Sequence, residues 1–320
     1  MPPGPATGPA TDPAGASRSA ASLIQQGIAL HRAGRLDAAA ALYERVLAEH
    51  GHTADALHLL GLLEILREEA GRAVGLIERA IALGPPQALY HHILAEACRK
   101  AGRAEDARHH YRLALDRDPA LVDSAIALGD LARADGDHQG AVAFFESALK
   151  ARPDDARLRL RQAEALMATG RPAEAAEHYR RAIRLGLDRA GVHNNLGLAF
   201  VAAGRLPLAV AAFRQATLLD PGDPTALVNL GDALLGLGDL DAAERALRGA
   251  LRIDPALASA HLNLGNVLRR RNLLGEATQS YRRAAVLAPD NPRAQGNLGM
   301  ALAEAGRIGE AIPALRFAQR

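Results

Sequence analysis

The chain has very few cysteine and aromatic residues. It contains no tryptophan and one cysteine, and aromatic residues make up only 3% of its 320 residues, although 49% are hydrophobic. A single cysteine, Cys98, cannot form an internal disulfide, which fits a reducing compartment. Any core must therefore consist mainly of alanine, leucine and small side chains, a composition that suits closely packed helices.

A strong charge of one sign is also missing. The formal net charge is +2, and basic residues alternate with aspartate and glutamate along the chain instead of clustering. A nucleic-acid-binding protein usually carries a basic patch or stripe. We therefore expect no nucleic-acid partner.

Long apolar runs are absent as well. Residues 1–19 are rich in proline, alanine and glycine, without the basic segment and apolar run of a secretory signal, so we predict a disordered tail. The most apolar stretch, residues 57–66, is interrupted by Glu64 and is much shorter than the ~20 residues that span a bilayer. We expect a cytoplasmic protein without a membrane segment.

The sequence does contain a 34-residue period. Position 8 of each unit is glycine or alanine, and position 20 is alanine in all nine units. Two helices can cross closely only where no large side chain intervenes. The units start, without insertion or deletion, at Ala20, Ala54, Ala88, Val122, Ala156, Ala190, Pro224, Ala258 and Pro292.

The rarer residues follow the same period. Position 24, which we expect to fill the gap between one hairpin and the next, is aromatic in six units: Tyr43, Tyr111, Phe145, Tyr179, Phe213 and Tyr281. Prolines that would end the second helix occupy position 32: Pro85, Pro119, Pro153, Pro221, Pro255 and Pro289. Glycines that would form the turn within the hairpin occupy position 15: Gly34, Gly102, Gly136, Gly170, Gly204, Gly238 and Gly306.

This set of positions over residues 20–320 resembles the tetratricopeptide repeat. The resemblance implies an all-α fold, a right-handed superhelical solenoid of nine helix-turn-helix repeats. It also implies that the first helices line a concave groove, with positions 2, 5, 6, 9, 12 and 13 facing inward. A single hairpin could not bury its apolar face, so stability must come from stacking neighbours.

Two repeats depart from the pattern. Repeat 2 has Glu68 at the turn position and glycines at 71 and 75, in or near its second helix, which predicts lower local stability. Repeat 9 stops at Arg320 without a polar capping helix, so we expect an exposed apolar face that includes Leu315 and Ala318. A truncated chain, a self-association surface and a further domain all remain open.

Four successive repeats carry asparagine at position 6: Asn195, Asn229, Asn263 and Asn297. An asparagine amide both donates and accepts, so a row of them can pair with the backbone of an extended peptide without reading its sequence. The row resembles the asparagine ladder of O-linked N-acetylglucosamine transferases, where it holds substrate or partner chains. The alternative is that these are ordinary solvated polar residues.

Further candidate contacts lie beside this ladder. Asn266, Arg269 and Arg270 should face the same groove, where the arginines could hold an acidic ligand, although such a run is more often a solvated surface. Repeat 3 concentrates four histidines with Cys98: His91, His92, His109 and His110. Because no pair has the spacing of a known metal motif, we expect no metal, and no cofactor or catalytic motif is recognisable.

We therefore expect a non-catalytic scaffold that binds a protein or an extended peptide. An alternative follows from residues 52–65, which resemble the leading repeats of bacterial proteins that join such arrays to transferase domains. In that case the chain would recruit substrate for a catalytic domain that it does not itself contain. A third possibility is self-association through repeat 9.

Overall fold

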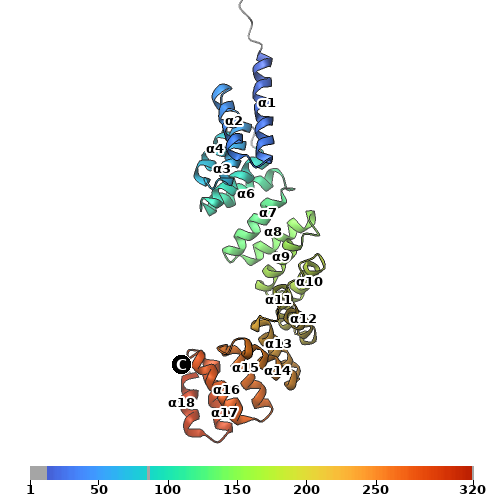
Figure 1. Ribbon diagram of the computed structural model, residues 1–320, viewed down its shortest axis with the longest axis vertical. Coiled ribbons are helices and arrows are strands. Elements are labelled where there is room, and N and C mark those ends of the chain that lie inside the picture. The colour runs from blue at the N-terminus through green and yellow to red at the C-terminus, as the bar shows by residue number, and fades with distance from the viewer. Residues whose placement is uncertain (1–12, 85–86, 319–320) are drawn as a thin grey trace, which may run out of the picture. The chain divides into compact units, whose positions relative to one another are not determined.

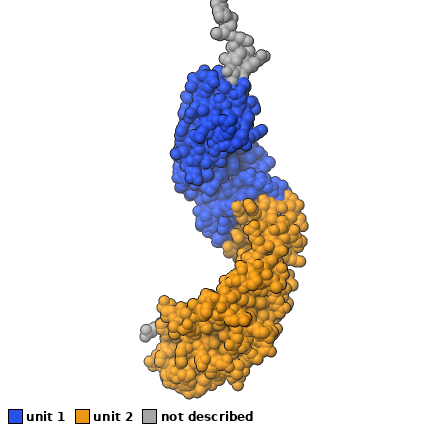
Figure 2. Space-filling model, in the orientation of Figure 1, with its two compact units in different colours: residues 1–152 blue, residues 153–320 orange. Residues whose placement is uncertain are grey.

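The computed structural model describes residues 13–84 and 87–318, and this part of the chain contains eighteen α-helices and no strand (Figure 1). The predicted all-helical class is confirmed. The helices form consecutive antiparallel pairs, and the chain divides into two compact units, residues 1–152 and 153–320 (Figure 2).

Unit 1 contains repeats 1 to 4. Its helices are α1 (Pro13–Arg32), α2 (Leu36–Glu49), α3 (Ala54–Leu66), α4 (Ala70–Leu83), α5 (Ala88–Lys100), α6 (Ala104–Arg117), α7 (Val122–Ala134) and α8 (His138–Ala151). Helix α1 begins at Pro13, so residues 13–19 of the expected tail are helical, whereas residues 1–12 lie outside the described part. Each helix packs on the one that follows it within the unit.

Unit 2 contains repeats 5 to 9. Its helices are α9 (Ala156–Ala168), α10 (Pro172–Arg184), α11 (Ala190–Ala202), α12 (Leu206–Leu219), α13 (Pro224–Leu237), α14 (Leu240–Ile253), α15 (Ala258–Arg270), α16 (Leu274–Leu287), α17 (Pro292–Glu304) and α18 (Ile308–Ala318). From α3 onward, every first helix begins at position 1 of its repeat, and every second helix begins at position 17. Of the position-32 prolines, Pro85 lies outside the described residues, and the other five stand between helices.

One close approach holds each hairpin together. In the seven repeats with glycine at position 8, this residue of the first helix lies directly under the large side chain at position 24 of the second. A Cβ atom added to Gly197 would lie 2.4 Å from Cε1 of Phe213, and one added to Gly231 would lie 2.6 Å from Cγ of Leu247. The position-24 side chain also packs onward, since Tyr43 shares a core cluster with Leu57 of the next repeat.

The turn position adopts the same backbone conformation in every repeat. The position-15 glycines have φ between 71° and 83°, a region that residues with a Cβ rarely occupy. Repeats 2 and 8 reach this conformation without glycine, with Glu68 at φ 66° and Asn272 at φ 62°. Asparagine tolerates this region better than glutamate, so the strain lies chiefly at Glu68.

In repeat 9, Leu315 is less exposed than the sequence predicts. This side chain is only partly exposed, because it occupies position 24 and lies against Gly299 of α17, whose added Cβ would be 2.6 Å from its Cγ. The exposed apolar side chains of α18 are instead Ile308, Ile312 and Phe317. Arg320, at the expected end of this helix, lies outside the described residues.

Across the residues that the structure describes, no helix has the length and apolar character needed to cross a membrane.

Substituting the position-8 glycine tests the close approach. Gly197→Ala should lower the free energy of unfolding by about 1–3 kcal/mol, because its methyl group would overlap the Phe213 ring. Gly191→Ala, on the same helix with open space around it, should leave stability unchanged or raise it by less than about 1 kcal/mol. Urea unfolding of both variants measures the difference, and equal values would contradict the role of the contact.

Relieving the turn strain should stabilise the chain. Glu68→Gly should raise the free energy of unfolding by about 1 kcal/mol, since glycine removes the steric cost of the left-handed conformation. Asn272→Gly, the matched change in repeat 8, should have a smaller effect because asparagine already tolerates this conformation. Thermal unfolding of the two variants gives the comparison, and a destabilised Glu68→Gly protein would refute the assignment of strain.

Candidate binding face

The candidate binding face is the surface formed by positions 2, 5, 6, 9, 12 and 13 of the first helices of unit 2, which we call the first-helix face. The helices that form it are α9, α11, α13, α15 and α17. The four asparagines at position 6 lie on the last four of these helices, and each is partly exposed: Asn195, Asn229, Asn263 and Asn297.

Two of the four asparagine side chains form hydrogen bonds with the neighbouring repeat. Nδ2 of Asn229 donates to Oδ1 of Asn194 at 2.9 Å, and Nδ2 of Asn297 donates to Oδ1 of Asn266 at 3.0 Å. Such bonds stabilise the stacking of one first helix on the next, each by about 0.5–1.5 kcal/mol. These two side chains keep their own carbonyl oxygens for other contacts.

The amides of the other two asparagines are free to form hydrogen bonds with a ligand. Within the described part of the chain, Asn195 and Asn263 have no hydrogen-bond partner. Asn195 lines a groove of about 250 Å³ together with Glu164, Met167, Tyr179 and Leu198. Leu198 is 40% exposed, so this groove offers an amide, a carboxylate and apolar surface side by side.

Two of the position-24 tyrosines donate hydrogen bonds to the position-9 side chains of their own repeats. The Tyr281 hydroxyl donates to Oδ1 of Asn266 at 2.9 Å, and the Tyr111 hydroxyl donates to the Glu96 carboxylate. In repeat 5 the same two positions hold Tyr179 and Glu164, and burial together with the Glu164 charge raises the pKa of the Tyr179 hydroxyl above its ordinary value. Asn266 therefore already accepts two hydrogen bonds within the protein.

The two arginines expected to face an acidic ligand connect adjacent repeats instead. Nη1 of Arg269 lies 3.0 Å from Oε1 of Glu304, and Nη1 of Arg270 donates to the backbone oxygen of Leu235 at 2.6 Å. Lys100 makes the equivalent bond in unit 1, to the backbone oxygen of Ile65 at 3.2 Å. A cation at position 13 thus satisfies a carbonyl near the C-terminus of the preceding first helix.

The histidines of repeat 3 belong to the packing of unit 1. His91 is 5% exposed, and its Nδ1 lies 3.3 Å from Nδ1 of His110. Cys98 is fully buried in a hydrophobic core cluster with Tyr111 and Leu128. Among the residues described, no three or more histidine, cysteine, aspartate or glutamate side chains are grouped so that they could hold a metal ion.

Burial keeps two histidines of unit 1 neutral. The pKa of His58, stacked on Tyr90 with ring centroids 4.4 Å apart, is lowered to about 4 by burial. The pKa of His91 is also lowered to about 4, first by burial and then by the positive charges of Arg117 and the neighbouring histidines.

The segment that suggested a transferase link is part of the core. Helix α3 covers most of residues 52–65 and buries the apolar side chains of Leu57, Leu60 and Leu63. The Glu64 carboxylate, 1% exposed, lies 3.4 Å from Arg67 and 3.7 Å from Arg72. Packing and charge pairing therefore account for this sequence.

Sequence reasoning missed two parts of the binding face. Asn194 precedes Asn195 in the run NNLG, and its position 5 could have indicated a contact with the next repeat. The groove beside Asn195 combines Glu164 and Met167 of α9 with Tyr179 of α10. No single sequence position indicates this groove, because its walls come from repeats 5 and 6.

The depressed histidine pKa values predict that unit 1 loses stability in mild acid. The unfolded chain binds protons on His58 and His91 below about pH 6.5, whereas the folded chain does so only near pH 4. Stability contributed by the neutral forms is therefore complete above pH 6.5 and is lost as the pH falls toward 4. The urea midpoint should be lower at pH 5 than at pH 7.5, and the combined His58→Leu and His91→Leu variant should lose part of this dependence, because burial also lowers the pKa of His92 and His110. Equal midpoints in the wild type would refute the prediction.

Comparisons with known proteins agree with the helical-repeat fold. The family described as the cilia and flagella-associated protein 70 C-terminal domain matches residues 58–288, and the tetratricopeptide repeat matches residues 24–88 and 262–320. No curated protein matches the chain.

Solved structures share the fold. YrrB, described as a TPR protein with an unusual peptide-binding site, is 22% identical with a TM-score of 0.50, over 57% of this chain and 95% of YrrB. The MamA protein is 24% identical with a TM-score of 0.50, over 53% of this chain and 92% of MamA. Likeness at this identity shows the fold alone. With nine helical hairpins in the described residues and family matches over more than half of its length, the chain belongs to the tetratricopeptide-repeat family.

Proposed function

We propose that the chain is a scaffold whose first-helix face holds an extended segment of another protein. The observation that carries the proposal is the pair Asn195 and Asn263, two partly exposed amides at the same position of their repeats, neither of which has a hydrogen-bond partner within the described residues. Each can donate to and accept from a peptide backbone.

Apolar surface adjoins these amides. Leu198 and Val201 on α11 and Met300 on α17 are 37–41% exposed on the same face, at positions 9 and 12. A peptide whose backbone forms hydrogen bonds with the two amides would cover these apolar side chains with its own side chains. The proposal thus combines modest polar contacts with burial of apolar area, which supplies most of the affinity in such interfaces.

YrrB, which shares the fold, carries a peptide-binding site, and the proposal extends peptide binding to this chain. It assigns no catalysis. A recruiting arm for a transferase would use the same face, but packing accounts for the segment 52–65 that suggested it. Peptide or protein binding is therefore the proposed role.

A comparison of two double variants tests the proposal. Peptides selected from a displayed random library against the purified chain provide the ligand, and fluorescence anisotropy gives its Kd. Asn195→Ala with Asn263→Ala should weaken binding by roughly tenfold without changing the urea midpoint, since each amide loses about 0.5–1.5 kcal/mol of contact with the ligand.

The matched control is Asn229→Ala with Asn297→Ala. These side chains connect repeats, so their removal should lower the free energy of unfolding by about 1–3 kcal/mol in total. Equal binding by the first variant and the wild type would reject the first-helix face as the peptide site.

A further inference from the structure

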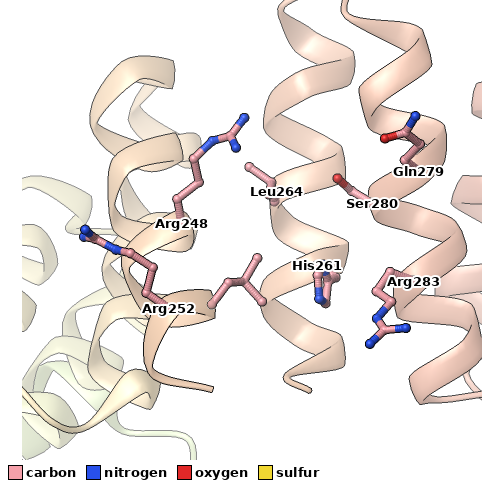
Figure 3. Close-up of a pocket in the computed structure, with 8 residues that line it drawn as sticks. Arg248, Arg252, His261, Leu264, Gln279, Ser280 and Arg283 are labelled. Carbon is pink, nitrogen blue, oxygen red and sulfur yellow. The ribbon is translucent and has the colours of Figure 1, made fainter. Parts of the chain in front are cut away.

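A further groove in unit 2 lies away from the first-helix face. It has a volume of about 520 Å³ and is formed by α14, α15 and α16 (Figure 3). Two of these are second helices of adjacent repeats, and α15, the first helix of repeat 8, lies between them. We call it the second-helix groove.

The walls and floor of this groove differ in chemistry. Figure 3 shows Arg248 and Arg252 on the α14 wall and Arg283 on the α16 wall, with Leu264 of α15 between the walls. Leu251 also lines the groove, and no acidic side chain does. The arrangement is an apolar floor next to His261, flanked by positive charge, with the neutral polar side chains of Gln279 and Ser280 on the α16 wall.

Two of the three arginines are free to bind a ligand. Arg248 is paired with Glu244 at 2.8 Å and with Glu276 at 3.5 Å. Arg252 and Arg283 are exposed, and within the described part of the chain neither has an ion-pair or hydrogen-bond partner. They stand on opposite walls. In Figure 3 the Arg252 guanidinium points away from the groove, so this exposed side chain has to turn inward for one ligand to contact both arginines.

The equivalent groove one repeat further has different chemistry. It is formed by α16, α17 and α18, and its lining includes an acidic side chain, Glu310, which lies 3.2 Å from Arg282. Phe317 occupies position 26, where the second-helix groove has Arg283. The pair of Arg282 with Glu310 corresponds to that of Arg248 with Glu276, so the two grooves differ mainly in the unpaired arginines Arg252 and Arg283, which only the second-helix groove has.

We propose that the second-helix groove binds an acidic protein segment with an apolar side chain, whose carboxylates pair with Arg252 and Arg283 while the apolar side chain covers Leu251 and Leu264. Carboxylates form bidentate pairs with arginine, and the apolar floor favours a peptide over a nucleic acid. Bases stack most often on exposed aromatic rings, and the lining of this groove has no aromatic residue except His261, whose Nε2 lies 3.0 Å from the Pro255 carbonyl oxygen.

This surface is distinct from the first-helix face, so one chain could hold two segments at once. If the second-helix groove does not bind the acidic segment, the proposed function of the first-helix face is unaffected, because the two sites share no residues.

The test uses a fluorescein-labelled peptide of alternating glutamate and leucine, with anisotropy measured at low and high salt. The wild type should bind it with an affinity that falls as salt rises. Arg252→Glu with Arg283→Glu should weaken binding by roughly tenfold or more, as expected for two reversed surface charges. Circular dichroism should show unchanged helicity.

The control is Arg189→Glu with Arg205→Glu, which makes the same charge change at two exposed residues between helices of unit 2, outside both surfaces. It should retain wild-type affinity for the acidic peptide. The groove variant should in turn retain the binding of peptides selected on the first-helix face. Equal loss in the two double variants would mean that net charge alone controls binding, and would overturn the proposal.

Two further ligands test the proposal. A peptide of alternating glutamate and serine should bind more weakly than the leucine peptide, and equal binding would refute the role of the apolar floor. An oligonucleotide of equal charge that bound more tightly, and lost affinity in the groove variant, would overturn the choice of a protein segment.

Discussion

Every hairpin of this protein depends on the approach of a large side chain at position 24 to a small residue at position 8. Where position 8 is glycine, the ring or branched side chain occupies the space of the missing Cβ, as Phe213 does over Gly197. This brings the two helices close enough to bury their alanine-rich surfaces. The same large side chain then packs on the next repeat, so hairpin and stack share one contact.

The turn within the hairpin imposes the second constraint. The chain must pass through a left-handed residue to reverse direction in so few positions, and the structure keeps this conformation even at Glu68. Packing of the helices on either side therefore overrides the local preference of the residue. The cost is concentrated in repeat 2, which also contains Gly71 and Gly75 within α4.

Function would depend on polar side chains that stacking leaves unpaired. Bonds between residues 35 positions apart recur in both units, from Tyr90 to Asp55 and from Asn229 to Asn194. They hold first helices together, and they use several side chains that would otherwise face a ligand. The side chains left over define the two surfaces that we propose to bind other proteins, one on each side of unit 2.

The sequence by itself determined the period, the all-helical fold and the positions of the small, aromatic and turn residues, because these recur in every repeat and act within it. It could not distinguish Asn195 from Asn229, which share a position and a residue type. Only the tertiary structure decided that Asn229 meets an acceptor and Asn195 does not. It also placed Arg252 and Arg283 across one groove, because the contacts of a side chain depend on how adjacent repeats stack, and stacking is set by the packing of whole helices.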